Sequence, residues 1–398
     1  MNIFKKIYCR IFQKCFHIAL PFLPYQDPRI ERHVVAIPGI LKAEGAKKPL
    51  IITDANISGL GLPDSLKAAL DKNGMEYAYF DRAFPNPTIA LCEEAHDFYA
   101  AKGCDSIIAF GGGSPMDLAK ACGIIEVRPD KPLSKMGGIL KVRKKLPLLI
   151  AIPTTAGTGS ETTLAAVVVD GRTRHKFAIN DFPLIPKYAV LDQAMVHSSP
   201  SFVAATTGLD ALTHAVEAYI GNSTTPGTRK NALDAVQLIF DNLDTAYTDG
   251  SNKEARRNML RASYFAGCAF TKSYVGYVHA IAHSLGGQYN IPHGLANAIL
   301  LPHVLEAYGK TIYKKLAALA VAAGIATCET PVEEAALRFI QAIKDMKVRF
   351  GIGDTIPQIR EEDIPKLSHY ADKEANPLYP VPVLMDAHEL EKFYYMLE

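Results

Sequence analysis

The feature that most restricts the fold of this sequence is a change of pattern near residue 195. Before it, short apolar runs at 49–54, 106–110 and 147–152 alternate with helical periodicity, which predicts a doubly wound α/β domain with a mostly parallel sheet. After it, alanine-rich helical segments follow one another from 201 to 350 without a convincing strand. We therefore predict an α/β domain over 26–195 and an all-helical domain over 196–398, preceded by an extension over 1–25. Residues 350–398, rich in prolines, are expected to be loops on the surface.

The bulk composition limits the classes of partner and compartment. With 43 basic and 41 acidic residues among 398, the net charge is only +2, so nothing indicates a nucleic-acid partner. The seven cysteines are scattered and contain no Cys-x-x-Cys, which indicates free thiols in a reducing cytoplasm.

The extension over residues 1–25 has the periodicity of an amphipathic helix. Charges and prolines interrupt it, which argues against a secretory signal and against a membrane-spanning helix. Two alternatives stay open: the helix docks on its own chain or on a sister subunit, or it lies on an anionic membrane surface through residues 1–20. Its apolar stripe comprises Ile3, Phe4, Ile7, Tyr8, Ile11, Phe12, Cys15 and Phe16, and the opposite face carries Lys5, Lys6, Arg10, Lys14 and His17.

Two glycine-rich loops follow predicted strands. The run 106–110 leads directly into Gly111, Gly112, Gly113 and Ser114, and Pro115 suits the first position of the next helix. Backbone N–H groups at such a turn can approach an anion closely, which predicts a phosphate-binding turn, although it is not the G-x-G-x-x-G fingerprint. The alternative is a tight turn without a ligand.

The second loop, residues 153–161, follows the run 147–152. Its hydroxyls and glycines offer donors for phosphate or ribose, and the alternative is a polar turn whose Thr158 and Ser160 cap the next helix. Asp54 ends the first apolar run. It is either a helix cap or a carboxylate for the ribose hydroxyls of an adenosine, where it would repel the 2′-phosphate of NADP and so favour NAD.

The helical half contains five candidate metal ligands in three clusters. Asp210 and His214 are four residues apart, and so are His279 and His283, so each pair shares a helix face. His293 follows in a Pro-His-Gly sequence. One carboxylate with imidazoles suits Zn²⁺ or Fe²⁺. The alternatives are a surface ion pair and histidines that satisfy hydrogen bonds in the core.

At this point the sequence resembles the iron-containing (group III) alcohol dehydrogenases, from about residue 48 to the C-terminus. The resemblance implies a dinucleotide-binding α/β domain and a helical metal-binding domain. The matching segments are Gly111-Gly-Gly-Ser-Pro-Met-Asp117-Leu-Ala-Lys120, Thr154-Thr-Ala-Gly-Thr-Gly-Ser-Glu161, Gly208-Leu-Asp-Ala-Leu-Thr-His-Ala215, Val278-His-Ala-Ile-Ala-His283-Ser-Leu-Gly and Pro292-His-Gly-Leu-Ala-Asn297.

The resemblance also assigns roles to single residues. It implies that iron is held by Asp210, His214, His279 and His293, and that His283 is an unligated proton relay beside the reacting centre. The residues it places around NAD are Asp54, Gly111, Gly112, Gly113, Ser114, Asp117, Thr154, Thr155, Thr158 and Lys176.

The implied activity is hydride transfer between NAD and a small primary alcohol or diol and its aldehyde, in a cytoplasmic homodimer. Residues 1–47 depart from the usual family start. Phe270, Lys272 and Tyr274 are expected at the substrate pocket, where Lys272 and Tyr274 replace smaller or neutral residues. The alternative activity is that of a lyase-type relative, similar to dehydroquinate synthases, which uses NAD transiently; its Glu/His/His ligands differ from this set.

Overall fold

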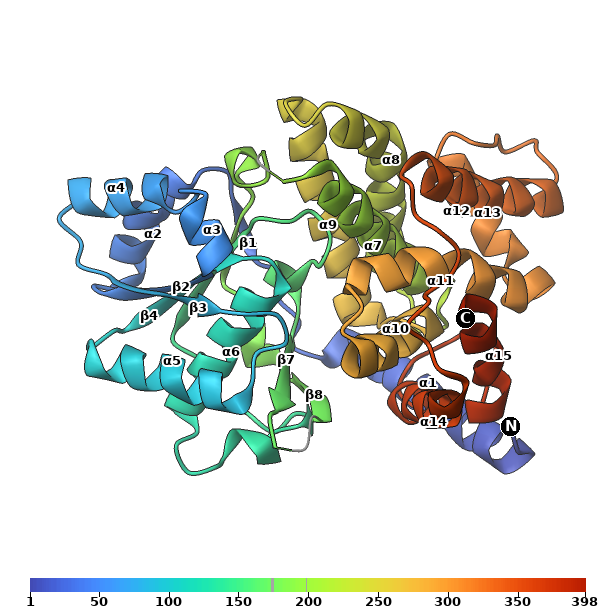
Figure 1. Cartoon of the computed structure of the whole chain (residues 1–398), viewed down its shortest axis with the longest axis horizontal. Coiled ribbons are helices and arrows are strands. Elements are labelled where there is room, and N and C mark those ends of the chain that lie inside the picture. The colour runs from blue at the N-terminus through green and yellow to red at the C-terminus, as the bar shows by residue number, and fades with distance from the viewer. Residues whose placement is uncertain (173–174, 198) are drawn as a thin grey trace. The chain divides into compact units, whose positions relative to one another are not determined.

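A computed structural model describes residues 1–172, 175–197 and 199–398. The chain divides into two compact units (Figure 1). The sheet unit consists of Pro24–Ser199, and the helical unit consists of Met1–Leu23 together with Pro200–Glu398.

Within its described residues, the sheet unit has a main sheet of six parallel strands in the order β1-β9-β6-β4-β2-β3. Buried, nearly continuous apolar runs form its central strands, as parallel sheets covered on both faces require. Strands β2, β4 and β6 are those that the three apolar runs predicted. The three-residue strands β1 and β9 were not predicted. The strands are β1 (Arg29–Glu31), β2 (Pro49–Asp54), β3 (Ala78–Ala83), β4 (Ser106–Gly111), β6 (Leu148–Pro153) and β9 (Tyr188–Val190).

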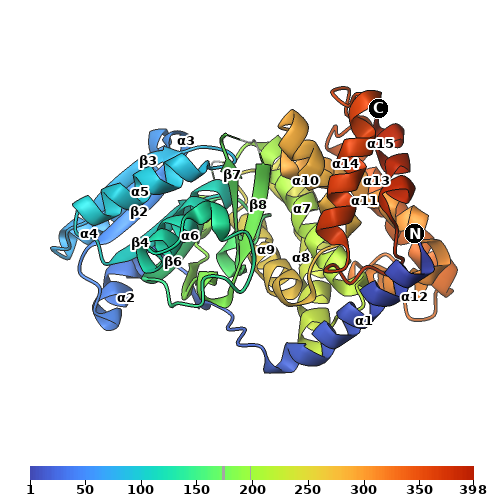
Figure 2. The same ribbon diagram turned by 90° about the horizontal axis from the view of Figure 1, so that it is seen from below.

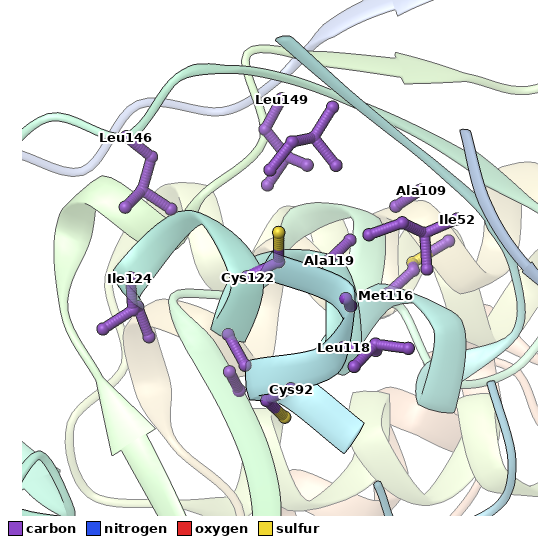
Figure 3. Packing of buried hydrophobic residues seen from close by; sticks show 14 of the residues in the cluster. Ile52, Cys92, Ala109, Met116, Leu118, Ala119, Cys122, Ile124, Leu146 and Leu149 are labelled. Carbon is purple, nitrogen blue, oxygen red and sulfur yellow. The ribbon is translucent and has the colours of Figure 1, made fainter. Parts of the chain in front are cut away.

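Helices cover both faces of this sheet, which confirms the doubly wound α/β fold (Figure 2). Successive side chains of a strand point to opposite faces. Ile52 therefore packs toward α5 (Ile89–Ala101) and α6 (Gly113–Val127), whereas Ile51 packs toward α2 (Ile37–Glu44) and α4 (Asp64–Lys72). Figure 3 shows the first of these cores, in which Met116, Ala119 and Cys122 of α6 face Ala109 and Leu149 of the strands.

A smaller sheet adjoins α6 in the same unit. Its strands β7 (Ala165–Asp170) and β8 (His175–Asn180) pair antiparallel, and β5 (Gly138–Ile139) pairs parallel with β8. Our sequence reading did not predict these strands. Only four positions of the sequence, 171–174, lie between β7 and β8, which is too few for the crossover helix that neighbouring parallel strands require.

In the described part of 200–398 every regular element is a helix, as predicted. The long helix α7 is almost completely buried and packs against α8, α9 and α11. The helices are α7 (Ser201–Ile220), α8 (Pro226–Thr248), α9 (Lys253–Ser273), α10 (Tyr277–Tyr289), α11 (His293–Tyr308), α12 (Tyr313–Ala322), α13 (Val332–Arg349), α14 (Ile364–Ala375) and α15 (Ala387–Leu397).

The prediction that residues 350–398 are loop-rich was wrong for α14 and α15. Helix α15 begins at a capping box between Asp386 and Glu389, and it buries Leu390, Phe393 and Leu397, which share one face. Of the prolines in this segment, only Pro365 lies within a helix, in the first turn of α14, where proline is compatible with helical structure.

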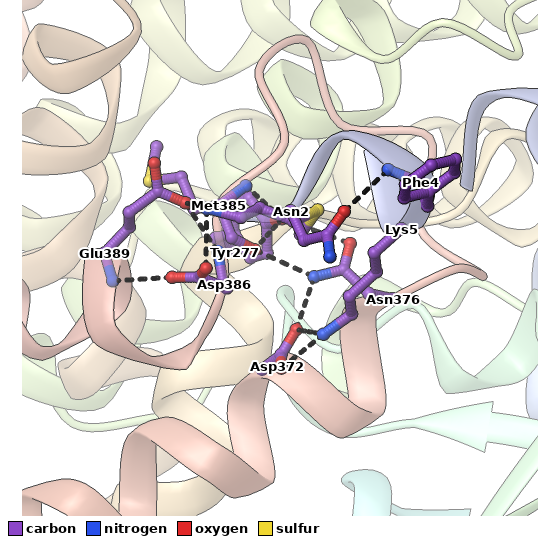
Figure 4. A network of polar contacts seen from close by, with 10 residues as sticks. Asn2, Phe4, Lys5, Tyr277, Asp372, Asn376, Met385, Asp386 and Glu389 are labelled. Atoms are coloured by element: carbon purple, nitrogen blue, oxygen red, sulfur yellow. Dashed lines mark hydrogen bonds and ion pairs between the residues drawn. The ribbon is translucent and has the colours of Figure 1, made fainter. Parts of the chain in front are cut away.

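Helix α1 (Ile3–Ala19) also belongs to the helical unit. The Lys5 ammonium pairs with Asp372 of α14, and Asp372 accepts a further hydrogen bond from Asn376 (Figure 4). No helix in the described residues is both long and apolar enough to cross a membrane. All seven cysteines are free thiols, as predicted.

Candidate metal centre and cofactor loops

Four side chains from three helices of the helical unit converge on one point. Asp210 and His214 lie on α7, His279 on α10 and His293 at the start of α11. One ligand atom from each lies within 4.8 Å of those of the other three. Asp210 Oδ1 is 3.9 Å from His279 Nε2 and 3.6 Å from His293 Nε2. Atoms that each bind one ion at about 2 Å lie roughly 3 to 4 Å apart, so this donor set fits a divalent cation.

The close approach of α11 to α7 depends on a glycine. A Cβ on Gly294 would lie 2.6 Å from the main-chain oxygen of Thr206 on α7, so a larger residue would push the two helices apart. Gly294 follows His293 directly. The Pro-His-Gly sequence therefore brings the imidazole of α11 to the carboxylate of Asp210.

Two neighbours organise these donors, and the sequence reading did not identify either. Glu217 Oε2 lies 2.6 Å from His279 Nδ1, and Glu217 also accepts hydrogen bonds from the main-chain N–H groups of Gly276 and Val278. A carboxylate that binds Nδ1 leaves Nε2 of the imidazole directed at the cation position. Glu217 stands three residues after His214 on α7, and this spacing could have indicated it.

Asn297 is the second of these neighbours. Its Nδ2 lies 2.7 Å from Asp210 Oδ1, 3.2 Å from His279 Nε2 and 3.0 Å from His293 Nε2. Asn297 is four residues after His293 on α11, so both side chains lie on one face of that helix.

Burial controls the charge of the centre. Asp210, His214 and His279 are nearly inaccessible to solvent, whereas His293 is half-buried. Burial raises the pKa of Asp210 and lowers the pKa of His279, and neighbouring histidines lower the latter further. His279 therefore favours the neutral form, which is the form that binds metals.

His283 lies beside the four donors with a different partner. Its ring stacks on that of His293 at a centroid distance of 5.0 Å. Its Nδ1 is 2.6 Å from Glu374 Oε1, which also accepts a 2.7 Å hydrogen bond from the Tyr379 hydroxyl. Neither Glu374 nor Tyr379 was predicted, because both lie in the segment expected to be loops.

The three residues expected at the substrate pocket occupy the last turn of α9 and its end. Phe270 stacks on the His214 ring at 4.2 Å between centroids, next to the donor set. Lys272 is half-buried in the last helical turn. Tyr274 has a positive φ of 60° and packs against Phe16 of α1 at 5.1 Å between centroids. Such a φ is rare for an aromatic residue. It persists only where packing of the surrounding residues keeps the backbone in this unfavourable conformation.

In the sheet unit, the predicted phosphate-binding loops follow the adjacent strands β4 and β6. Gly111 has φ +151°, and a Cβ there would lie 2.6 Å from Pro115, so only glycine fits this turn. The two loops lie against each other, so that a Cβ added to Gly112 would be only 3.4 Å from Thr155 Oγ1.

Unsatisfied hydroxyls of the second loop fit a polar ligand. Among the described residues, Thr154 Oγ1 and Thr155 Oγ1 are buried without a hydrogen-bond partner. Thr158 Oγ1 accepts a 3.3 Å hydrogen bond from the N–H of Ser160, whereas the N-cap of the short 3-10 helix Ser160–Thr162 is Gly159, so no side chain caps that helix. Gly113 packs beside Thr158, and Ser114 is half-buried in the first turn of α6.

The remaining predicted cofactor residues lie in the same unit. Asp54 ends β2, next to β4, and its Oδ1 caps the short helix α3 (Ala55–Gly59) by accepting from the N–H of Ile57. Asp54 is therefore a helix cap, which was one of its two predicted roles. Its second carboxylate oxygen can still accept hydrogen bonds. Asp117 is half-buried in α6. Lys176 lies on β8, where its Nζ donates to Asn86 Oδ1 at 2.8 Å.

Comparison with known proteins places this architecture in a family. The family model "Iron-containing alcohol dehydrogenase" matches residues 31–193, and the model "Fe-containing alcohol dehydrogenase family, C-terminal" matches residues 204–395. The 1,3-propanediol dehydrogenase of Klebsiella pneumoniae is 38% identical over 336 residues, covering 83% of this chain and 87% of the relative.

A second relative, the NAD-dependent methanol dehydrogenase of Bacillus methanolicus, is 36% identical over 335 residues, which cover 83% of this chain and 87% of the relative. A crystal structure of a 1,3-propanediol oxidoreductase superposes with a TM-score of 0.90 at 34% identity, covering 94% of this chain and 99% of that one. This chain therefore belongs to the iron-containing alcohol dehydrogenase family and is an oxidoreductase rather than a lyase.

Proposed function

We propose that this chain is an NAD-dependent alcohol dehydrogenase that uses Fe²⁺ to interconvert a small primary alcohol or diol and its aldehyde. The observation that carries the proposal is the convergence of Asp210, His214, His279 and His293 within 4.8 Å. The family and the alcohols named for its relatives support a small alcohol as substrate.

In this proposal the four donors hold the metal, with Fe²⁺ favoured over Zn²⁺ by the family. When bound, the metal supplies a Lewis acid for the alcohol or carbonyl oxygen, and the nicotinamide supplies the hydride acceptor or donor. Glu217 keeps the His279 ring in position, and the half-buried His283 moves a proton between the reacting centre and solvent, with Glu374 on its other nitrogen.

The cofactor is proposed to bind along the ends of β2, β4 and β6. The N–H groups of Gly112, Gly113 and Ser114 suit the pyrophosphate, supported by Thr154, Thr155 and Thr158. Asp54 favours NAD over NADP because its carboxylate would repel a 2′-phosphate. Asp117 and Lys176 complete the proposed set, with Lys176 near the nicotinamide ribose.

Metal analysis of the anaerobically purified protein, with an NADH absorbance assay on short alcohols, diols and aldehydes, tests the proposal. We expect about one Fe²⁺ per chain and net NADH formation. His214→Ala should lose both the metal and turnover, whereas His388→Ala, at an exposed histidine of α15, should keep both. A fully active, metal-free His214→Ala enzyme would contradict the proposed metal site.

His283→Ala separates proton transfer from metal binding. We expect this variant to retain the metal and to lower kcat by about 10²- to 10⁴-fold, the usual contribution of a general acid or base. Loss of the metal would instead make His283 a ligand.

With NADP as cofactor, Asp54→Ala should gain activity relative to wild type, and an unchanged NAD preference would remove Asp54 from the cofactor site.

A further inference from the structure

Helix α1 turns its apolar side to solvent. The side chain of Phe4 is 77% exposed, and the stripe continues beyond the helix with Phe22, which is 85% exposed. Large apolar side chains are rarely gathered in one exposed row without a binding role. We call this row the solvent-facing stripe, and its members are Ile3, Phe4, Ile7, Tyr8, Ile11, Ile18 and Phe22.

Polar contacts on the other side of α1 fix this orientation. Arg10 donates 2.7 Å hydrogen bonds to the main-chain oxygens of Val381 and Pro382. The buried Gln13 donates to the main-chain oxygen of Tyr379 at 2.7 Å. These bonds are buried or half-buried, so rolling the stripe inward would leave polar groups unsatisfied. The solvent-facing stripe is therefore a stable surface of the helical unit.

The charged side chains of α1 itself are all positive, and of these Lys5 is paired with Asp372 of α14. Residues 1–26 contain four lysines and arginines and no aspartate or glutamate. Lys14 is exposed, and a groove beside the stripe is lined by Lys6 and Arg10 together with Ile7, Ile11 and 382–384. The Arg10 guanidinium is bonded to uncharged main-chain oxygens and to Gln13, so these contacts do not neutralise its charge.

The combination of an exposed apolar stripe with positive side chains favours an anionic lipid surface over a second copy of the chain as the partner. A helix that lies in a bilayer interface presents an apolar face flanked by Lys and Arg, whose long stems allow the charges to reach the lipid phosphates. In a symmetric contact between two copies, each stripe would bring its own Lys6, Arg10 and Lys14 toward the same cations of the other copy.

We propose that α1 is a membrane-surface anchor. Its solvent-facing stripe inserts at the boundary between head groups and acyl chains of an anionic bilayer, while Lys6 and Lys14 contact the lipid phosphates and the docked Arg10 adds its positive charge to that surface. Attachment is peripheral, and the inner side of α1 stays docked on α14 and on residues 377–382.

Co-sedimentation of the full-length enzyme with vesicles tests the anchor. One set of vesicles contains phosphatidylcholine alone, and the other contains about 30% phosphatidylglycerol, which supplies an anionic surface. We expect binding to the anionic vesicles that weakens at high salt. Ile7→Glu/Ile11→Glu should lower it by about tenfold or more, because both changes place a charge in the inserted face.

The matched control is Leu337→Glu/Val348→Glu, which alters two exposed apolar residues of α13 and should bind like the wild type. Because all four positions face solvent, circular dichroism and lipid-free turnover should be unchanged in both variants. Failure of the wild type to bind anionic vesicles, or equal binding to both vesicle types, would overturn the proposal. A lower molar mass of Ile7→Glu/Ile11→Glu in light scattering, without vesicle binding by the wild type, would assign the stripe to a contact between copies.

Discussion

Glu217 contacts His279 from 62 positions away in the sequence. This contact orients the imidazole so that its Nε2 faces the other three donors. In Glu217→Gln, an amide NH₂ replaces one of the two oxygens that accept N–H groups, so at least one buried donor loses its partner. We expect metal affinity to fall about 10- to 100-fold, as for other outer-shell partners of metal-binding histidines. Competition with a chromophoric chelator measures the change.

The control for this variant is Glu306→Gln, which alters a half-exposed carboxylate of α11 that pairs with Lys344. It should leave the metal dissociation constant unchanged. If Glu217→Gln also binds the metal like the wild type, the carboxylate does not orient His279 in the metal-bound protein.

Lys120 ties helix α6 to the end of the second proposed cofactor loop and the residues that follow it, inside the sheet unit. It is completely buried on α6, and its Nζ donates to the main-chain oxygens of Ser160, Thr163 and Ala165 at 2.8 to 2.9 Å. Glu161 is buried nearby. Burial lowers the pKa of Lys120 to about 8, although the carboxylates of Asp117 and Glu161 oppose this shift, and burial raises the pKa of Glu161 to about 7, against the weaker effect of Lys120.

Lys120→Met should therefore loosen residues 160–165, because the main-chain oxygens of Ser160, Thr163 and Ala165 would all lose the ammonium donor. We expect the KM for NAD to rise by about tenfold and the protein to lose at least about 1 to 3 kcal/mol of stability, the cost of one buried carbonyl left without a donor. Steady-state kinetics and denaturant unfolding measure the two effects. Lys72→Met, at an exposed lysine of α4, is the control, and identical kinetics of both variants would argue against a role in cofactor binding.

At the scale of residues, sequence spacing could predict the candidate metal ligands, but it could not assign a separate role to each of them. The i, i+4 pairs on α7 and α10 indicated Asp210, His214, His279 and His283 because a helix repeats every 3.6 residues. Spacing alone could not separate His283 from the four donors. That distinction depends on Glu374, which approaches His283 from 91 positions away. Contacts of such long range follow from helix packing, which no local pattern encodes.

At the scale of elements, prediction succeeded where burial leaves a regular pattern. The runs that became β2, β4 and β6 are apolar throughout because helices cover both faces of the sheet. Strands β1 and β9 have three residues each, too few to show a period. Helix α1 showed a clear apolar stripe, but periodicity cannot tell which side of a helix docks. The structure docks the side that carries Cys9 and Gln13.

A row of aromatic rings connects the inner side of α1 to His283, the proposed proton relay. Phe16 packs edge-on against Tyr274, and Tyr274 lies 6.2 Å from the Tyr379 ring. The Tyr379 hydroxyl bonds Glu374, which holds His283. Phe16→Ala would remove the ring that packs against Tyr274, whose backbone has a strained positive φ. The contacts between Tyr274, Tyr379 and Glu374 should loosen as a result.

We expect Phe16→Ala to lower kcat several-fold with little change in metal content, and to cost about 1 to 2 kcal/mol of stability because the ring is only half-buried. Phe16→Leu should restore most of both quantities. Phe4→Ala, on the solvent-facing stripe, serves as the control and should retain wild-type kcat. If Phe16→Ala loses stability but keeps the wild-type kcat and pH–rate profile, α1 supports the fold and not the active centre.

At the scale of the whole molecule, the proposed metal donors and the proposed cofactor loops belong to different compact units. The donors Asp210, His214, His279 and His293 all lie in the helical unit, on α7, α10 and α11. The sheet unit has its own buried cores on both sides of β2, β4 and β6. A ligand that binds only the folded state stabilises the part of the chain that must be folded to bind it.

Metal removal should therefore weaken the helical unit selectively. At free metal 100-fold above the dissociation constant, binding contributes about 2.7 kcal/mol, so a chelator should lower the Tm of the metal-dependent transition by roughly 5 to 10 °C. In hydrogen exchange, amides of α7, α10 and α11 should lose protection, while those of β2 and β4 should change little. His214→Ala should respond to neither chelator nor added metal. Equal loss of protection in both units would show that the metal stabilises the chain as one cooperative body.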